Sequence, residues 1–343
     1  MGKPVPAFCM DNRRWTTFVF QREIHDHEEH RQSAEKQVAN AVKKYSSQFR
    51  NRALAGVCGM LLLLRPILAL AQPDLPLTIP LKGDHIDVDV AGNVYLLSSQ
   101  ENVLRLYDAA FRPMVKIGEA GWDEGRFDRP ASVWARNGVD IFVADYGNHR
   151  IQRFDRVLNF VSELSTHESD NATQRFGYPT DVALSRLGEL FIVDSENQKI
   201  VKVNSQNTVV NAFGGYGAGQ GRLHTPTRLE IGPGDNIYVI DGERVVAFDA
   251  FGNFVHELYK GMLRHPSDLF GDDRRLMVLD GDSLYCFDKH ERQVGVQDVR
   301  ALVGERFERV TSLATVNGKL YLLGDFGLRV IQDPFDEALT KPY

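Results

Sequence analysis

The stretch IFVADYGNHRIQRFD at 141–155 returns at 190–204 as LFIVDSENQKIVKVN. Shorter copies follow as IYVIDGERVVAFD at 237–249 and LMVLDGDSLYCFD at 276–288. Fainter copies flank these four, VYLLSSQENVLRLYD at 94–108 and LYLLGDFGLRVIQD at 320–333. The aligned residues are 39 to 49 positions apart: Ser98, Asp145, Asp194, Asp241, Asp280 and Gly324. A period of this length, with two strand patterns in each copy, is typical of propeller blades.

Each copy encodes one four-stranded unit. An apolar run such as 141–143 predicts a buried strand, an Asp-rich turn follows, and the alternating residues 151–155 predict a second strand. A proline ahead of most copies, as in YPTDVAL at 178–184, predicts the start of another strand, because proline fits where no ladder N–H is needed. An outer strand such as 209–213 completes the unit. We therefore expect an all-β protein, a six-bladed β-propeller of four-stranded antiparallel blades within residues 72–343.

The last copy lacks an outer strand, because few residues follow Asp333. The β-prone stretch LPLTIPL at 75–81 precedes the first copy. We expect this N-terminal strand to pair with the strand near 328–332 and close the ring, which would remove an open sheet edge.

These repeats resemble the NHL family. The matching pattern is PxxV, an apolar strand ending in Asp, and NxRI, with glycine-rich linkers at 118–130 and 214–226. The resemblance covers about residues 84–333, and the fourth copy departs from it because Asp241-Gly-Glu-Arg runs directly into Val245. It implies a six-bladed propeller of the bacterial exported type. Since such propellers are mostly binding or scaffold modules and some are enzymes, the resemblance supports the fold more than an activity.

Charge divides the chain into two parts. Residues 1–71 hold 11 basic and 6 acidic residues, which leaves 29 basic and 40 acidic residues in 72–343. Affinity for phosphate comes from Lys and Arg, so an acidic propeller argues against a nucleic-acid partner.

An apolar stretch, ALAGVCGMLLLLRPILALA at 53–71, follows Arg50 and Arg52 and ends in Ala69-Leu-Ala71. It predicts a signal peptide over about 50–71, cleaved before Gln72, and hence a periplasmic or secreted protein. The alternative is an uncleaved anchor at 53–71 that holds the propeller in the inner membrane facing the periplasm, the one membrane contact that we expect. Residues 1–50 would then be a polar extension, disordered or not translated. Cys286 is the one cysteine of 72–343, so we expect no disulfide there.

A ring of polar residues is predicted at one mouth of the channel. The first strand of each blade lines the channel, and two residues after its proline, or the equivalent position, stand Asp87, Ser132, Asp181, Arg228, Asp268 and Ser312. Three carboxylates could hold Ca²⁺ or Zn²⁺, and Arg228 opposes a cation by repulsion. We expect no catalytic residue and no resident cofactor. The second series, Asp145, Asp194, Asp241 and Asp280, is interpreted as structural turn caps.

Two functions remain open. The first is a non-catalytic module that binds a protein or glycan through this ring and through Trp122 and Tyr216 on the glycine-rich loops. The alternative is a metal-dependent, lactonase- or lyase-like enzyme with its site at the channel mouth, which would gather several carboxylate or His ligands around one metal. The sequence contains no GxSxG, GxxxxGK[ST] or HExxH motif, and we favour the binding module.

Overall fold

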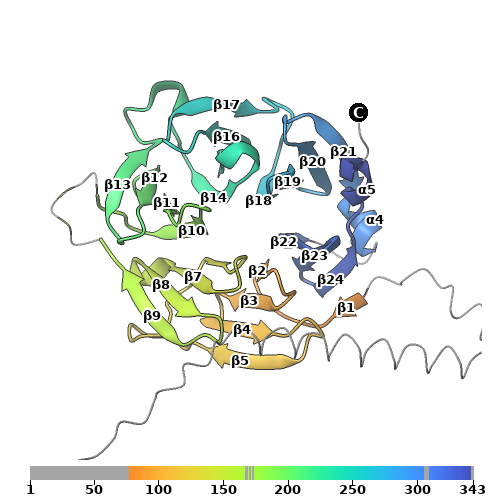
Figure 1. Cartoon of the computed structure of the whole chain (residues 1–343), viewed down its shortest axis with the longest axis horizontal. Coiled ribbons are helices and arrows are strands. Elements are labelled where there is room, and N and C mark those ends of the chain that lie inside the picture. Colours follow the sequence, from red (N-terminus) through yellow and green to blue (C-terminus); the bar gives the residue numbers. More distant parts are fainter. Residues whose placement is uncertain (1–76, 167–168, 170, 172–173, 305–308, 341–343) are drawn as a thin grey trace, which may run out of the picture. The chain divides into compact units, whose positions relative to one another are not determined.

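The computed structural model describes residues 77–304 and 309–340, apart from 167–168, 170 and 172–173. These residues form six four-stranded antiparallel sheets set around a common centre, which confirms the predicted all-β, six-bladed propeller (Figure 1). The polar extension at 1–50 and the signal peptide at 50–71 lie outside the described residues and stay predictions.

The blades follow one another along the chain. Blade I consists of β2 (His85–Val88), β3 (Val94–Ser98), β4 (Val103–Tyr107) and β5 (Pro113–Ile117). Blade II consists of β6 (Ser132–Trp134), β7 (Asp140–Asp145), β8 (Arg150–Asp155) and β9 (Phe160–Leu164), and blade III of β10 (Pro179–Leu184), β11 (Leu190–Asp194), β12 (Lys199–Val203) and β13 (Val209–Phe213). Blade IV consists of β14 (Pro226–Ile231), β15 (Ile237–Asp241), β16 (Arg244–Phe248) and β17 (Phe254–Leu258).

Blade V consists of β18 (Pro266–Gly271), β19 (Arg275–Asp280), β20 (Ser283–Asp288) and β21 (Gln293–Asp298). The last blade, blade VI, combines β22 (Val310–Val316), β23 (Lys319–Gly324) and β24 (Gly327–Gln332) with β1 (Leu77–Ile79). Two short helices of the described residues, α4 (Val299–Val303) and α5 (Asp336–Thr340), lie before and after β22–β24. No helix in the described part is both long and apolar enough to cross a membrane.

Strand β1 closes the ring as predicted. It runs antiparallel to β24, with Leu77 opposite Val330, Thr78 opposite Arg329 and Ile79 opposite Leu328. The most N-terminal strand of the propeller therefore completes the most C-terminal blade, and β24 has no open edge along these residues.

The four aspartates that end the second strands are structural, but they mainly hold the loop that enters the blade. Asp194 also accepts from the backbone of the turn that follows it, from Asn197 N at 3.3 Å, whereas the Asp145 side chain caps no backbone N–H of its own turn. Each is buried and accepts hydrogen bonds from the backbone of the loop that enters its own blade. Asp145 Oδ1 accepts from Asp128 N at 2.8 Å, and Asp241 Oδ1 accepts from Thr225 N at 2.6 Å. Equivalent bonds join Asp194 to Gly177 N and Asp280 to Arg264 N.

Turn length explains why the fourth copy departs from the repeat. In blades I to III the second and third strands are joined by four-residue turns, for example between the paired residues Asp145 and Arg150. In blades IV to VI only two residues separate the paired ends, as between Asp241 and Arg244. Gly242, with φ of 64°, supplies the positive φ that a two-residue hairpin requires.

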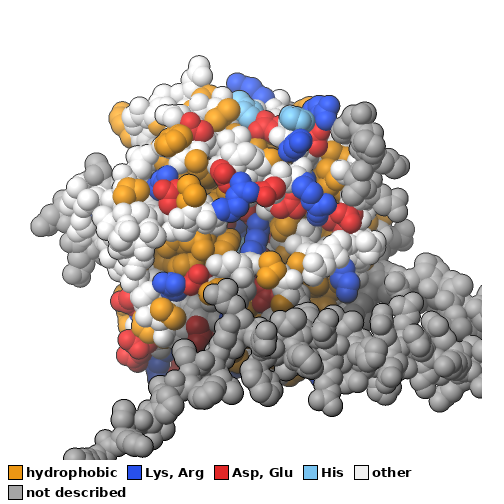
Figure 2. Space-filling view, in the orientation of Figure 1, with side chains coloured by type: hydrophobic (Ala, Val, Ile, Leu, Met, Phe, Trp, Pro, Cys, Tyr) orange, Lys and Arg blue, Asp and Glu red, His pale blue; other side chains and the backbone are white. Residues whose placement is uncertain are grey.

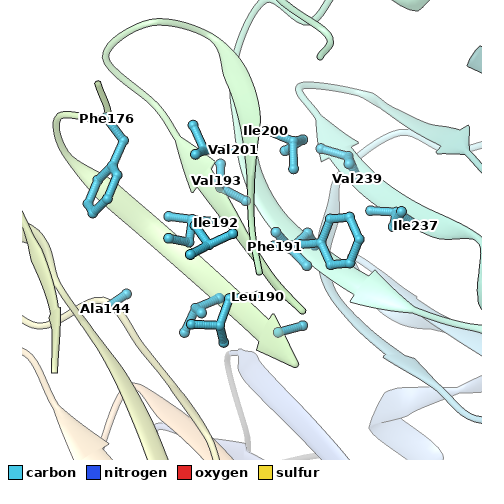
Figure 3. Packing of buried hydrophobic residues seen from close by; sticks show 14 of the residues in the cluster. Ala144, Phe176, Leu190, Phe191, Ile192, Val193, Ile200, Val201, Ile237 and Val239 are labelled. Atoms are coloured by element: carbon cyan, nitrogen blue, oxygen red, sulfur yellow. The ribbon is translucent and has the colours of Figure 1, made fainter. Parts of the chain in front are cut away.

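Packing between blades forms the core. One apolar cluster extends from Trp134 and Phe142 of blade II through blade III to Ile237 and Val239 of blade IV. Figure 3 shows side chains of β11 and β12 lying beside Ile237 and Val239 of the neighbouring blade. A fully buried side chain such as Phe191 contributes about 2–3 kcal/mol by leaving water, so each blade depends on its neighbours for stability.

Candidate functional site

The two ends of the central channel differ in what they carry. Each innermost strand is entered from an inter-blade loop and left through a tight turn to the second strand, because successive strands are antiparallel. We call the end with the inter-blade loops and the capping aspartates the loop end. The opposite end, with the tight turns after the innermost strands, is the hairpin end.

At the loop end the innermost strands place six equivalent residues in a ring. In each blade the ring residue pairs with the second-strand residue that directly precedes the aligned position of the repeat, which is Asp145 in blade II. The six ring residues are His85, Ser132, Asp181, Arg228, Asp268 and Ser312. Five of these agree with the sequence prediction. The prediction of Asp87 for blade I is wrong in register, because Asp87 pairs with Tyr95, two residues further along the channel. Blade I has no proline and no bulge at this point, so its first strand offered no marker to count from.

The ring ties neighbouring blades together. A side chain of one blade accepts a hydrogen bond from the backbone of the next, as when Asp181 Oδ2 accepts from Leu229 N at 2.9 Å and Asp268 Oδ2 accepts from Leu313 N at 2.8 Å. The same link joins blade VI back to blade I, since Ser312 Oγ accepts from Ile86 N at 3.3 Å. His85 Nδ1 accepts from Val133 N at 3.4 Å. These acceptors stabilise the ring of blades.

Arg228, which is half-buried, links three blades across the channel as a strap. Its Nη1 donates to Ala131 O at 3.1 Å and to Thr180 O at 3.2 Å, which are carbonyls of the strand entrances of blades II and III. Its Nε lies 4.0 Å from Asp268 Oδ1 of blade V. Arg228 therefore neutralises part of the buried negative charge, and its guanidinium is committed to the fold.

Burial changes the ionisation of the ring. It lowers the pKa of His85 well below the usual value, with Arg228 and Arg136 acting in the same direction, so a neutral imidazole with Nδ1 as acceptor is favoured. Burial raises the pKa of Asp181, and it raises the pKa of Asp268 to about 6 against the opposing charge of Arg228. Ionisation of Asp181 or Asp268 therefore lowers the free energy of unfolding.

We expect the propeller to lose stability as the pH rises through about 6. Because the pKa of Asp268 is higher in the folded than in the unfolded chain, its stabilising contribution is complete below about pH 4 and is lost above pH 6. The part of this loss that Asp268 contributes should be on the order of 2 kcal/mol between pH 4.5 and 8. Urea unfolding at a series of pH values measures it. Asp268→Asn should flatten the slope, the exposed control Asp123→Asn should not, and an unchanged slope in Asp268→Asn would contradict this role.

A second strap, which sequence reasoning missed, lies at the hairpin end. Arg136 follows β6 and donates from Nη1 to Glu230 Oε1 at 2.8 Å and to Gly271 O at 2.9 Å, and from Nη2 to Glu230 Oε2. Its Nε lies 3.4 Å from Asp87 Oδ1, and its guanidinium lies 4.5 Å from the ring centroid of Phe270. One side chain therefore joins blade II to blades I, IV and V.

This second strap is where Asp87 acts. Asp87 Oδ2 accepts from Ala135 N of blade II at 2.7 Å, while Oδ1 faces Arg136. Burial raises the pKa of Asp87 and raises that of Glu230 to about 8, with Arg136 opposing both shifts. A signal was present in the sequence, because Glu230 stands between the apolar residues Leu229 and Ile231, but its partner stands 94 residues away.

Charged side chains of both signs meet at the middle of the face shown in Figure 2. At the hairpin end a cavity of about 460 Å³ is lined by Trp134, Arg136, Leu184, Glu230 and charged rim residues. Arg186 bridges two of those rim residues, Asp235 at 2.8 Å and Asp273 at 2.5 Å. Arg136 and Arg186 at this end are therefore both paired with carboxylates.

The two predicted loop aromatics are exposed but lie at the outer part of the loop end. Trp122, 67% exposed, lines a shallow depression with Arg150 and Phe160 of blade II. Tyr216, 86% exposed, lies beside Phe213 and Phe254, with the Arg222 guanidinium 4.6 Å from its ring centroid. The structure thus separates these residues from the buried ring and from each other, with blades II and III between them.

A half-buried aromatic cluster occupies the region between these two loops, and sequence reasoning did not identify it. The rings of Tyr146 and Tyr178 are 4.9 Å apart between centroids, and those of His149 and Tyr178 are 4.2 Å apart. The Arg129 guanidinium lies 5.4 Å from the centroid of Tyr146. We call the set of Trp122, Arg129, Tyr146, His149, Tyr178 and Tyr216 the aromatic band.

A metal centre is not formed by the described residues, in which no three His, Cys, Asp or Glu side chains come together as a ligand group. At the loop end the carboxylates of Asp181 and Asp268 stand on alternate blades with Arg228 between them.

Three curated proteins are similar to part of the chain, and no family model matches it. Protein brain tumor of Drosophila melanogaster is 32% identical over 146 residues, 41% of this chain and 13% of that protein. A probable peptidyl-alpha-hydroxyglycine alpha-amidating lyase of Caenorhabditis elegans is 26% identical over 121 residues, 34% of this chain and 35% of that protein. A B-box type zinc finger protein of the same worm is 28% identical over 146 residues, 41% and 16% of the two chains. The chain spans about a third or less of these relatives.

Solved structures share the fold. A streptogramin B lyase superimposes with a TM-score of 0.52 at 14% identity, over 75% of this chain and 85% of that one. Virginiamycin B lyase from Staphylococcus aureus superimposes with a TM-score of 0.50 at 9% identity, over 77% and 90%. At these identities the likeness shows the propeller fold alone.

Proposed function

We propose that this chain is a non-catalytic binding module whose partner is a protein, and that the partner docks on the aromatic band of the loop end. The observation that carries the proposal is the exposure of Trp122 and Tyr216 on glycine-rich loops that flank the Tyr146–Tyr178 cluster. Aromatic and Arg side chains of this kind dominate the energy of protein interfaces, because they bury large areas with few rotatable bonds.

The roles of the channel residues support a binding rather than a catalytic function. The carboxylates of Asp181 and Asp268 accept backbone hydrogen bonds from the next blade, and Arg228 is held by two carbonyls. A carboxylate that already accepts these bonds and faces Arg228 is poorly suited to act as a general base or a metal ligand, because its charge is partly neutralised. The predicted ring is therefore assigned to the fold, and the docking function to the loops above it. A metal-dependent lyase or lactonase is the competing function, and stoichiometric Ca²⁺ or Zn²⁺ in the purified protein would favour it.

We expect the double substitution Trp122→Ala/Tyr216→Ala to weaken partner binding by at least about tenfold, since each removed aromatic contact at an interface costs on the order of 1–2 kcal/mol. The partner is first captured from an extract of the source cells and identified by mass spectrometry. Its affinity for each purified variant is then measured by isothermal titration calorimetry.

The matched control is Leu187→Ala/Phe251→Ala, which removes two side chains that are 80% and 75% exposed at the hairpin end. It should bind within about twofold of the unsubstituted chain. Equal affinities for the two double variants would show that the loop end is not the docking surface.

Export to the periplasm or the medium, with cleavage before Gln72, is part of the same proposal and rests on the sequence at 53–71. N-terminal sequencing of the native protein tests it, and peptides from residues 1–50 in a cytosolic fraction would overturn it.

A further inference from the structure

The junction of blades V and VI contains a basic cavity at the loop end. It has a volume of about 360 Å³ and is lined by the starts of β18 and β22, the turn after β19 and helix α4. The lining residues are His265, Ser267, Gly281, Asp282, Val299, Arg300, Val303, Arg309 and Val310. Among the described inter-blade connections this one alone contains an α-helix, so the cavity is a departure from the repeat.

Helix α4 is held firmly as a wall of this cavity. Asp298 caps it by accepting from Arg300 N at 2.8 Å, and Val299 N donates to Asp282 O at 2.8 Å. Val299 and Val303 are buried in the core between blades V and VI, next to Val310. The valines of the helix that line the cavity therefore also belong to the packed core, which fixes their position.

Among the residues that the structure describes, one arginine of the cavity has no carboxylate partner. Arg300 pairs with Asp282 at 2.5 Å, but the exposed Arg309 and His265 form no ion pair with any residue that the structure describes. Three other arginines of the loop end pair with carboxylates: Arg126 with Glu119, Arg150 with Asp145 and Arg244 with Asp241. Arg309 is thus a cation available to an anionic ligand.

We propose that this cavity binds an acidic, aliphatic peptide segment of the protein partner, a refinement that rests on the proposed docking function. A Glu or Asp carboxylate of the segment pairs with Arg309 and receives a hydrogen bond from His265 or Ser267. A neighbouring aliphatic side chain contacts Val299, Val303 and Val310. Charge complementarity selects this occupant, because one carboxylate matches the guanidinium of Arg309, which pairs with no carboxylate that the structure describes.

A nucleic acid fits the same cavity less well. The valine lining offers no aromatic ring for a base to stack on. Residues 72–343, with 29 basic and 40 acidic residues, also repel a polyphosphate chain as a whole.

The first test measures the binding of a short peptide with alternating Glu and Val, blocked at both ends, to the full chain by calorimetry. The Glu→Gln version of the same peptide should bind at least about tenfold more weakly, and added salt should weaken only the acidic peptide. Arg309→Glu should weaken the acidic peptide at least about tenfold, while Arg309→Lys keeps the charge and should stay within about threefold. Arg156→Glu, the same charge reversal at an exposed site of the hairpin end, is the matched control.

Three outcomes overturn the inference: no binding of the acidic peptide at millimolar concentration, equal binding of its Gln version, or tighter binding of a single-stranded RNA of similar length. The affinity of each variant for the captured partner distinguishes this inference from the proposed function. If Arg309→Glu keeps full affinity for the partner while Trp122→Ala/Tyr216→Ala loses it, the cavity is not part of the interface and the docking function stands. If both variants keep full affinity, both proposals are wrong.

Discussion

Replacing Arg136 by Met should lower the free energy of unfolding by about 3–5 kcal/mol at pH 7, which is the usual cost of removing one partner from a buried ion pair. The substitution keeps the aliphatic stem of the side chain but leaves the carboxyl groups of Asp87 and Glu230, both buried, without their cation. It also removes the link from blade II to Gly271 O of blade V. Urea unfolding followed by tryptophan fluorescence or circular dichroism measures the loss.

The pH dependence of the free energy of unfolding of Arg136→Met shows whether the unpaired carboxyls cause the loss of stability. Burial already raises the pKa of Glu230 to about 8 and raises that of Asp87, and without Arg136 both carboxyls will hold their protons more strongly. A protonated carboxyl costs less to bury than a carboxylate, so the deficit should shrink as the pH falls from 8 to 5. Arg136→Met/Glu230→Gln should recover part of the stability at pH 7, since a neutral amide replaces a buried carboxyl that must otherwise take up a proton or carry an unpaired charge.

Arg186→Met is the control for Arg136→Met. Arg186 also bridges two carboxylates at the hairpin end, but its side chain is 59% exposed. Ion pairs in contact with water contribute little, so we expect a change below about 1 kcal/mol. If Arg136→Met is no more destabilising than Arg186→Met, the strap across the channel does not hold the blades together.

Deleting residues 77–81 should destabilise the propeller by about 4–5 kcal/mol and lower its melting temperature by about 10 °C. The deletion removes the backbone pairing of β1 with β24 and the contacts of Ile79 and Leu81 with the core of blades VI and I. It also exposes the edge of β24 as a template for aggregation, so we expect concentration-dependent light scattering on heating. Differential scanning calorimetry together with scattering measures both effects.

Two point variants separate closure from a general effect of shortening the chain. Ile79→Asp places a charge against the partly apolar surface on which Ile79 packs and should reproduce a large part of the loss. Thr78→Ser, at an exposed position of the same strand, should change the melting temperature by less than about 2 °C. A deletion variant that melts like the intact chain would show that the ring is closed without β1.

Local patterns were sufficient to predict most of the fold. Three patterns reflect interactions within one blade and therefore repeat along the chain. They are the alternation of apolar residues, the prolines at strand starts and the Asp turns. The closing strand was also predictable, because a last copy with three strands demands a fourth from elsewhere. A structural role for Asp145 and Asp241 was predictable from the repeat, but their bonding partners were not, since each bonds to a loop 16 or 17 residues away in its own blade and not to the backbone of the turn that follows.

The register of blade I was decided by the tertiary structure. His85, and not Asp87, occupies the ring, because β2 starts without the proline and the bulge that mark blades III to V. A shift of two residues keeps the same face of the strand, so the hydrophobic pattern could not distinguish the two positions.

By itself the sequence determined the number of blades, their four-strand plan, the structural role of the aspartates and the strand that closes the ring, since all of these are encoded in residues close together or in a repeat. Only the tertiary structure decided which side chains meet across the channel and over the loop end: Arg136 with Glu230, Arg228 with blades II and III, Tyr146 with Tyr178, and Arg309 with His265 at one cavity. The reason is geometric. These residues belong to different blades, and closing the ring brings together positions that no local pattern relates.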